Sequence, residues 1–152
     1  MADGKNGLVI SLCLGWIAIL AMRAPLAFLP FLGLMAAGLV ILLAYNLRGR
    51  LFLGDGGSYG FATGIGLLTI AIYNSPGAHA GKAMPAEQIM LFFAVPVLDS
   101  FRLTFARLAR GQSPTDGDRD HLHLQNRFGW PKGLIVYLVI ALAPSAAMMA
   151  FD

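Results

Sequence analysis

Five apolar runs dominate the sequence, and their lengths constrain the fold more than any other feature. The runs cover residues 7–22, 25–45, 58–73, 87–105 and 133–151. A helix needs about 17 to 25 residues to cross the hydrocarbon of a bilayer, so the first and third runs must recruit flanking residues or lie where the membrane is thin. No strand alternation or internal repeat is evident. We predict an all-α fold, a polytopic membrane helix bundle of about five transmembrane helices, with residues 1–152 forming a single membrane domain.

Composition supports this interpretation. Hydrophobic residues make up 57% of the chain and charged residues 12%, with a mean hydropathy of +0.69, unlike an ordinary soluble domain. The pI near 9.4 does not indicate nucleic acid, because the basic residues form no patch with interleaved aromatics. The lone Cys13 lies in an apolar run and excludes an intrachain disulfide. A secretory signal is a weaker interpretation of the first run, since it lacks a basic leading region and further runs follow.

The positions of the Lys and Arg residues test the predicted membrane topology independently of hydropathy. If the N-terminus is cytoplasmic, nine of the 11 Lys and Arg residues fall inside and only Arg23 and Lys82 fall outside, which obeys the positive-inside rule. We therefore predict a multi-pass membrane protein with these basic loops on the cytoplasmic side. The inner set is Lys5, Arg48, Arg50, Arg102, Arg107, Arg110, Arg119, Arg127 and Lys132.

Acidic residues gather on the same predicted cytoplasmic side. Six of the eight lie there, in or beside three segments. Charged groups at this depth usually face a watery cavity and have partners, so the clustering predicts a functional site. The six are Asp3, Asp55, Asp99, Asp116, Asp118 and Asp120.

The first two segments are MADGKNGL and FLGDGGS. Asp3 and Asn6 share one face of a helical turn, although an N-terminal cap explains them as well. In the second segment, glycines allow a close backbone approach and Ser58 can cap the next helix. Asp55 then lies at a water-accessible helix start and suits Mg²⁺ beside a diphosphate. A plain glycine-rich turn is the alternative, and a P-loop is excluded because no Lys-Ser/Thr pair follows.

The third segment covers residues 96–130. Asp99 and Arg102 have the spacing of an ion pair on a helix, which leaves Arg107 and Arg110 to reach headgroups or phosphate. Snorkelling of these arginines is the structural alternative.

A polar loop follows within that segment. His121 and His123 point the same way only if the loop is extended. No further ligand completes a structural zinc site. Proton transfer or phosphate contact is the better match, with an exposed polar loop as the alternative.

Together, these segments resemble the polyprenyl-phosphate sugar-1-phosphate transferase family (glycosyltransferase family 4). The similarity rests on MADGKNGL, FLGDGGS, the Pro96-x-x-Asp99-x-x-Arg102 helix, Gly111-x-Ser113-Pro114 and Asp118-Arg119-x-His121-x-His123, in this order. The resemblance implies transfer of a sugar 1-phosphate, of the N-acetylhexosamine type, from a UDP-sugar to undecaprenyl phosphate in the lipid bilayer. UMP would be released, Mg²⁺ required, and the product used for cell-envelope polysaccharide.

The resemblance also implies residue roles. Asp55 would be the magnesium ligand, and Asp3 and Asn6 would line the nucleotide-sugar and phosphate site. Catalytic roles would fall to Asp3, Asp55, His121 and His123, with the two histidines contacting phosphate or sugar. Substrate contacts would add Asn6, Ser58, Asp118 and Arg119.

Two features depart from the family pattern. Leu124 stands where members commonly have another histidine, and no Asp-Asp pair occurs in the chain. We therefore expect the C-terminal half of a longer transferase, inactive alone, which a missing N-terminal half or a homodimer partner completes. The alternatives are a phospho-N-acetylmuramoyl-pentapeptide transferase, whose members resemble Pro-x-His-His-His in this loop, and a noncatalytic membrane module or transporter subunit, for which Pro96 and Asp99 are the only midplane candidates.

Overall fold

Helices make up the part of the chain that the structure describes. The computed structural model covers residues 4–75, 84–113 and 127–151, with no strand in these ranges. Each predicted apolar run forms one long helix, so the all-α prediction is confirmed. The elements are α1 (Gly4–Arg23), the short 3-10 helix η1 (Leu26–Phe28), α2 (Leu29–Leu47), α3 (Gly54–Tyr73), α4 (Ala86–Ala109) and α6 (Trp130–Phe151).

The first and third runs do recruit flanking residues. Both α1 and α3 have 20 residues, because each begins upstream of its apolar run. The start of α3 follows from Gly54, whose φ of 66° is open to glycine at no steric cost. A span of 20 residues matches the thickness of the hydrocarbon region.

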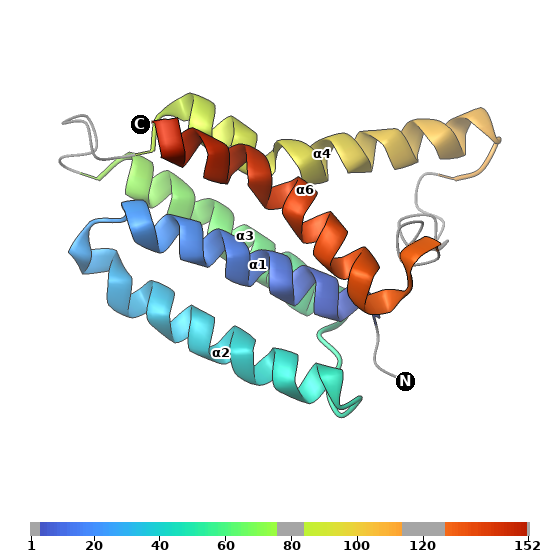
Figure 1. The fold of residues 1–152 in the computed structure, drawn as a ribbon, viewed down its shortest axis with the longest axis horizontal. Coiled ribbons are helices and arrows are strands. Elements are labelled where there is room, and N and C mark those ends of the chain that lie inside the picture. The colour runs from blue at the N-terminus through green and yellow to red at the C-terminus, as the bar shows by residue number, and fades with distance from the viewer. Residues whose placement is uncertain (1–3, 76–83, 114–126, 152) are drawn as a thin grey trace.

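The first helix forms the centre of the bundle. It contacts α2, α3 and α6, while α4 packs against α6 (Figure 1). Half of the buried core side chains belong to α1, Cys13 among them. Cys13 is a free, buried cysteine, in keeping with its place in an apolar run.

The outer surfaces of the bundle are apolar. Two helical stretches, Leu26–Leu47 and Ala86–Ala109, are long and apolar enough to cross a membrane. Of their most apolar 18 residues, only 11% and 6%, respectively, are buried. Gly7–Arg23 and Lys132–Ala147 are shorter apolar helices. A helix that is apolar but barely buried lacks the protein cover of a soluble core. The fold is therefore that of a helical membrane bundle.

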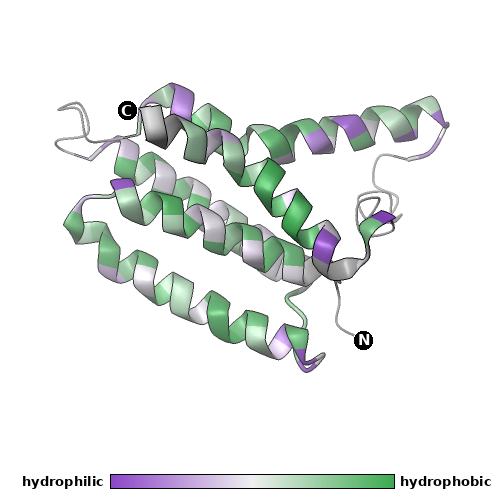
Figure 2. Cartoon of the chain, viewed as in Figure 1, coloured by the Kyte–Doolittle hydropathy of each residue, from purple (hydrophilic) through white to green (hydrophobic). Residues whose placement is uncertain are grey.

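Successive long helices run in opposite directions and bring the predicted segments to one side. The starts of α1, α3 and α6 and the ends of α2 and α4 all lie at the right in Figure 1. We call this side the motif end. Polar residues mark both sides of the bundle and the second half of α4 (Figure 2). Arg48, Arg50 and Arg110 lie at the motif end, whereas Arg23 and Glu87 lie at the opposite side.

Candidate functional site

Three predicted site residues, Asn6, Asp55 and Ser58, have a described backbone at the motif end. Asn6 lies in the first turn of α1 and Asp55 in the first turn of α3. The fold therefore brings together the starts of two helices that are 50 residues apart in sequence. The predicted residues that lie outside the described part of the chain are Asp3, Asp118, Arg119, His121 and His123.

The connection that delivers Asp55 is built from glycine turns. Gly49, with φ 67°, ends α2. Its N–H donates to the carbonyl of Asn46 at 2.9 Å, and the N–H of Arg50 donates to that of Tyr45 at 3.0 Å. This pair of bonds is the Schellman arrangement, which terminates a helix. Only four residues then separate Gly49 from Gly54, so α3 starts close to the end of α2.

A buried amide holds this connection. The side chain of Asn46 is 1% exposed, and its Nδ2 donates to the carbonyl of Leu51 at 3.1 Å. Its Oδ1 has no hydrogen-bond partner among the described residues. Sequence reasoning missed Asn46, although a lone amide at the end of an apolar helix is a signal that could have found it.

The predicted capping role of Ser58 is wrong. Helix α3 begins four residues earlier, and the Ser58 hydroxyl donates backwards to the carbonyl of Gly54 at 2.9 Å. The N-cap residue Leu53 provides no side-chain hydrogen bond. The side chain of Leu53 therefore accepts no hydrogen bond from the backbone N–H groups in the first turn of α3, around Asp55. Backbone N–H groups at a helix start favour anions.

The turn around Asp55 is the place where the sequence predicts a magnesium ion held with phosphate. A Cβ added at Gly56, the next residue in the sequence, would meet no atom within 4 Å. Among the described residues, no three His, Cys, Asp or Glu side chains form a metal cluster. Mg²⁺ commonly uses one or two carboxylates and takes its remaining ligands from phosphates and water.

The second half of α4 brings basic residues toward the motif end. The predicted ion pair is present, since Arg102 Nη2 and Nε both lie 2.9 Å from Asp99 Oδ1. Helix α4 ends at Ala109, and Gly111, with φ 68°, follows it in a second Schellman arrangement. Arg107 lies in its last turn and Arg110 at its C-cap, where positive charge is favourable.

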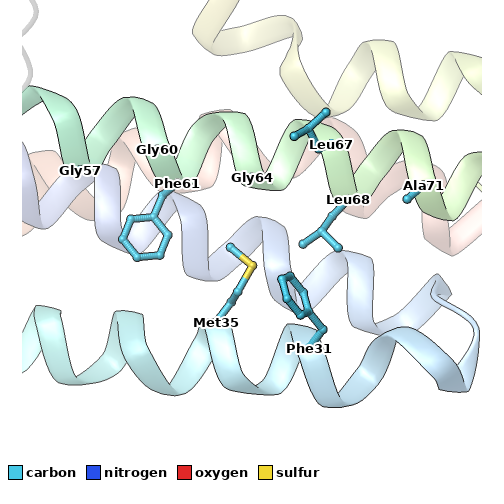
Figure 3. Close-up of a pocket in the computed structure, with 9 residues that line it drawn as sticks. All are labelled: Phe31, Met35, Gly57, Gly60, Phe61, Gly64, Leu67, Leu68 and Ala71. Atoms are coloured by element: carbon cyan, nitrogen blue, oxygen red, sulfur yellow. The ribbon is translucent and has the colours of Figure 1, made fainter.

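An apolar groove runs between α2 and α3 from the turn after Asp55 (Figure 3). Its volume is about 580 Å³, and no lining residue is titratable. The groove therefore supplies space for an apolar group and no chemistry of its own. It is lined by Phe31, Met35, Gly57, Gly60, Phe61, Gly64, Leu67, Leu68 and Ala71.

Comparison with known proteins gives relatives of one kind. The undecaprenyl-phosphate alpha-N-acetylglucosaminyl 1-phosphate transferase of Yersinia pestis is 31% identical over an alignment of 161 residues, which covers 98% of this chain and 42% of the relative. The proteins of the same name from Escherichia coli K12 and Shigella flexneri are 30% identical over 165 residues, 99% of this chain and 43% of their own length.

The chain thus spans about two fifths of the length of these curated relatives. No protein-family model matches it, and no solved structure matches it. The resemblance predicted from the motifs is confirmed, since the chain is similar over nearly its whole length to curated proteins named undecaprenyl-phosphate alpha-N-acetylglucosaminyl 1-phosphate transferase.

Proposed function

We propose that this chain carries part of a site that transfers N-acetylhexosamine 1-phosphate from a UDP-sugar to undecaprenyl phosphate. The observation that carries the proposal is that the described parts of the three motif segments lie toward one end of the bundle (Figure 1). The names of the relatives support the acceptor and the transferred group. The site lies at a bundle end, where a soluble nucleotide sugar and a membrane lipid can meet.

In the proposed reaction, an oxygen of the lipid phosphate attacks the sugar-bearing phosphorus of the UDP-sugar. The bond between the two phosphates of the donor breaks, UMP leaves, and the product is a lipid-linked diphosphate sugar. Phosphoryl transfer depends mostly on positioning and on charge stabilisation. The protein therefore needs to hold phosphates in line more than to form covalent bonds.

The residue roles follow from this requirement. Asp55 would hold Mg²⁺, which when bound neutralises charge on the diphosphate. Asp3 and Asn6 would line the donor site at the start of α1. The remaining contacts to phosphate or sugar would come from Ser58, Asp118, Arg119, His121 and His123.

The proposed orientation places the motif end in the cytoplasm of a bacterial cell, at the inner membrane. The supporting observation is that Arg48, Arg50 and Arg110 lie at this end. Positive residues mark cytoplasmic loops, and UDP-sugars are cytosolic. The product would then enter cell-envelope polysaccharide synthesis.

We also propose that turnover needs a protein segment that this chain does not contain, because the chain spans only about two fifths of the length of its relatives. The remaining length of such a protein, or a second copy of the chain, would complete the site. The chain alone is therefore expected to release no UMP.

The test is an assay of UMP release in proteoliposomes with undecaprenyl phosphate and Mg²⁺. The chain is assayed alone and co-expressed with the part of the Escherichia coli relative that lies outside the alignment. We expect release from UDP-N-acetylglucosamine only after co-expression, and its loss on chelation of Mg²⁺. Release only from UDP-N-acetylmuramoyl-pentapeptide would favour the other transferase. Absence of release with either donor, together with solute flux, would favour the transporter alternative.

A further inference from the structure

Helix α4 changes direction near its middle (Figure 1). Pro96 lies inside the helix at this point. Proline has no N–H to donate to the carbonyl four residues earlier, and its ring pushes the preceding turn aside. The carbonyl of Phe92 therefore loses its usual intrahelical partner.

A side chain from the central helix takes that partner's place. The indole N–H of Trp16, in α1, donates to the carbonyl of Phe92 at 3.1 Å across 76 residues of sequence. Trp16 is 6% exposed and Phe92 is fully buried. Water is thus kept from this carbonyl, and an unpaired carbonyl there would be unfavourable.

Aromatic packing holds the indole in place beside the bend. The Trp16 ring centroid lies 5.7 Å from that of Phe92 and 5.3 Å from that of Phe93. The two phenylalanine rings are themselves 5.1 Å apart, edge to face. These are favourable distances for aromatic pairs. The hydrogen bond therefore joins two elements that are already packed together.

Beyond the bend, the second half of α4 leaves the bundle. Residues 97–109 project away from the other helices toward the motif end (Figure 1). Their hydroxyls bond within the helix, Ser100 to the carbonyl of Pro96 and Thr104 to that of Ser100, both at 2.9 Å. These two hydroxyl bonds lie within the helix, and the bend at Pro96 is the point at which α4 departs from the bundle.

We propose that Trp16 is the positioning residue that sets the direction of the second half of α4. Its N–H replaces the missing N–H of Pro96 and so fixes the bend that aims Asp99, Arg102 and Arg107 at the motif end. The bend is independent of the proposed function. Its consequence for transfer rests on that function, because only then do these side chains serve the site.

A double-mutant cycle tests this coupling. Trp16→Phe keeps an aromatic ring but removes the N–H, and Pro96→Ala supplies a backbone N–H to the Phe92 carbonyl. With Pro96 present, Trp16→Phe is expected to lower the midpoint of thermal unfolding by about 2–4 °C. In the Pro96→Ala background, the same change is expected to lower it by less than half as much.

The direction of α4 gives a second readout. Spin labels replace Met22 and Leu108, which are both exposed, in a chain whose native cysteine is removed by Cys13→Ala. Trp16→Phe is expected to broaden the distance distribution only when Pro96 is present. Phe93→Leu is the control, since it weakens the ring packing and leaves the hydrogen bond; its effects should be the same with either residue at position 96.

Equal effects of Trp16→Phe in the two backgrounds, or an unchanged distance distribution with Pro96 present, would overturn the proposal. Neither readout needs transferase activity, so the result stands whether or not the proposed function holds. Where UMP release is measurable, Trp16→Phe is expected to lower kcat and leave the KM for the donor unchanged, and Phe93→Leu is expected to change kcat less.

Discussion

Asn46 and Trp16 perform the same task at different places in the bundle. Each donates a side-chain N–H to a main-chain carbonyl, of Leu51 and of Phe92 respectively. Inside a membrane protein, water is scarce and such carbonyls need a protein partner. The sequence identifies the donor side chain in each case. It does not identify the acceptor, because every residue carries a main-chain carbonyl. The pairing could therefore not be predicted from the sequence.

The Asn46 bond should matter for stability and for the placing of Asp55. Asn46→Ala removes the donor to the Leu51 carbonyl and is expected to lower the free energy of unfolding by about 1–3 kcal/mol. It should also raise the Mg²⁺ concentration needed for half-maximal UMP release, because the connection to α3 loosens. Chemical unfolding in detergent and a magnesium titration measure the two effects.

Thr69→Ala is the matched control for Asn46→Ala. Thr69 is also buried, but its hydroxyl bonds to the carbonyl of Ile65 within the same helix at 2.8 Å. Its replacement should change stability and leave the magnesium requirement as it was. Equal magnesium requirements for the two variants would contradict a role for Asn46 in positioning Asp55.

The helices differ in how their glycines are used. A Cβ at Gly15 of α1 would fall on Leu142 Cδ1 and lie 3.1 Å from Leu142 Cδ2, so α1 and α6 approach closely there. A Cβ at Gly60 of α3 would meet nothing within 4 Å, since it faces the apolar groove. Small residues allow close helix packing in membranes. Gly15 serves that purpose, and Gly60 leaves open space.

Alanine substitution at these two positions should have opposite effects. Gly60→Ala gains helix propensity and is expected to stabilise the protein by up to about 1 kcal/mol. Gly15→Ala gains the same propensity but forces Leu142 to move, and we expect a net loss of about 1 kcal/mol or more. Unfolding in detergent compares them. A destabilising Gly60→Ala would contradict the open groove.

Element boundaries show where sequence reasoning fails. The five helices were predicted because apolar length alone identifies a span. The capping role of Ser58 was wrong, because the chain turns at Gly54 with a positive φ and α3 begins there, four residues upstream of Ser58. Backbone conformation of this kind has no signature beyond the glycine itself. The Ser58 assignment failed for that reason.

For the whole molecule, the gathering of the motif segments could be predicted and the packing could not. Alternating helices of similar length must return the chain to the same side, so Asn6 and Asp55 lie on the same side of the bundle. The central position of α1 and the departure of α4 after Pro96 depend on which helix faces pack against each other, and several of these faces are equally apolar. Hydropathy does not distinguish those faces. The contacts between Trp16, Phe92 and Phe93 do so in the structure.

The central claim is that the carboxylate at the start of α3 serves the transfer of sugar phosphate. The most direct measurement compares UMP release by Asp55→Asn and by Glu87→Gln in the co-expressed proteoliposomes. Both changes replace a carboxylate by its amide, but Glu87 is exposed in the first turn of α4 on the opposite side of the bundle. We predict that Asp55→Asn lowers release by at least about 100-fold with membrane insertion intact, while Glu87→Gln stays within about twofold. Equal release by the two variants would contradict the account.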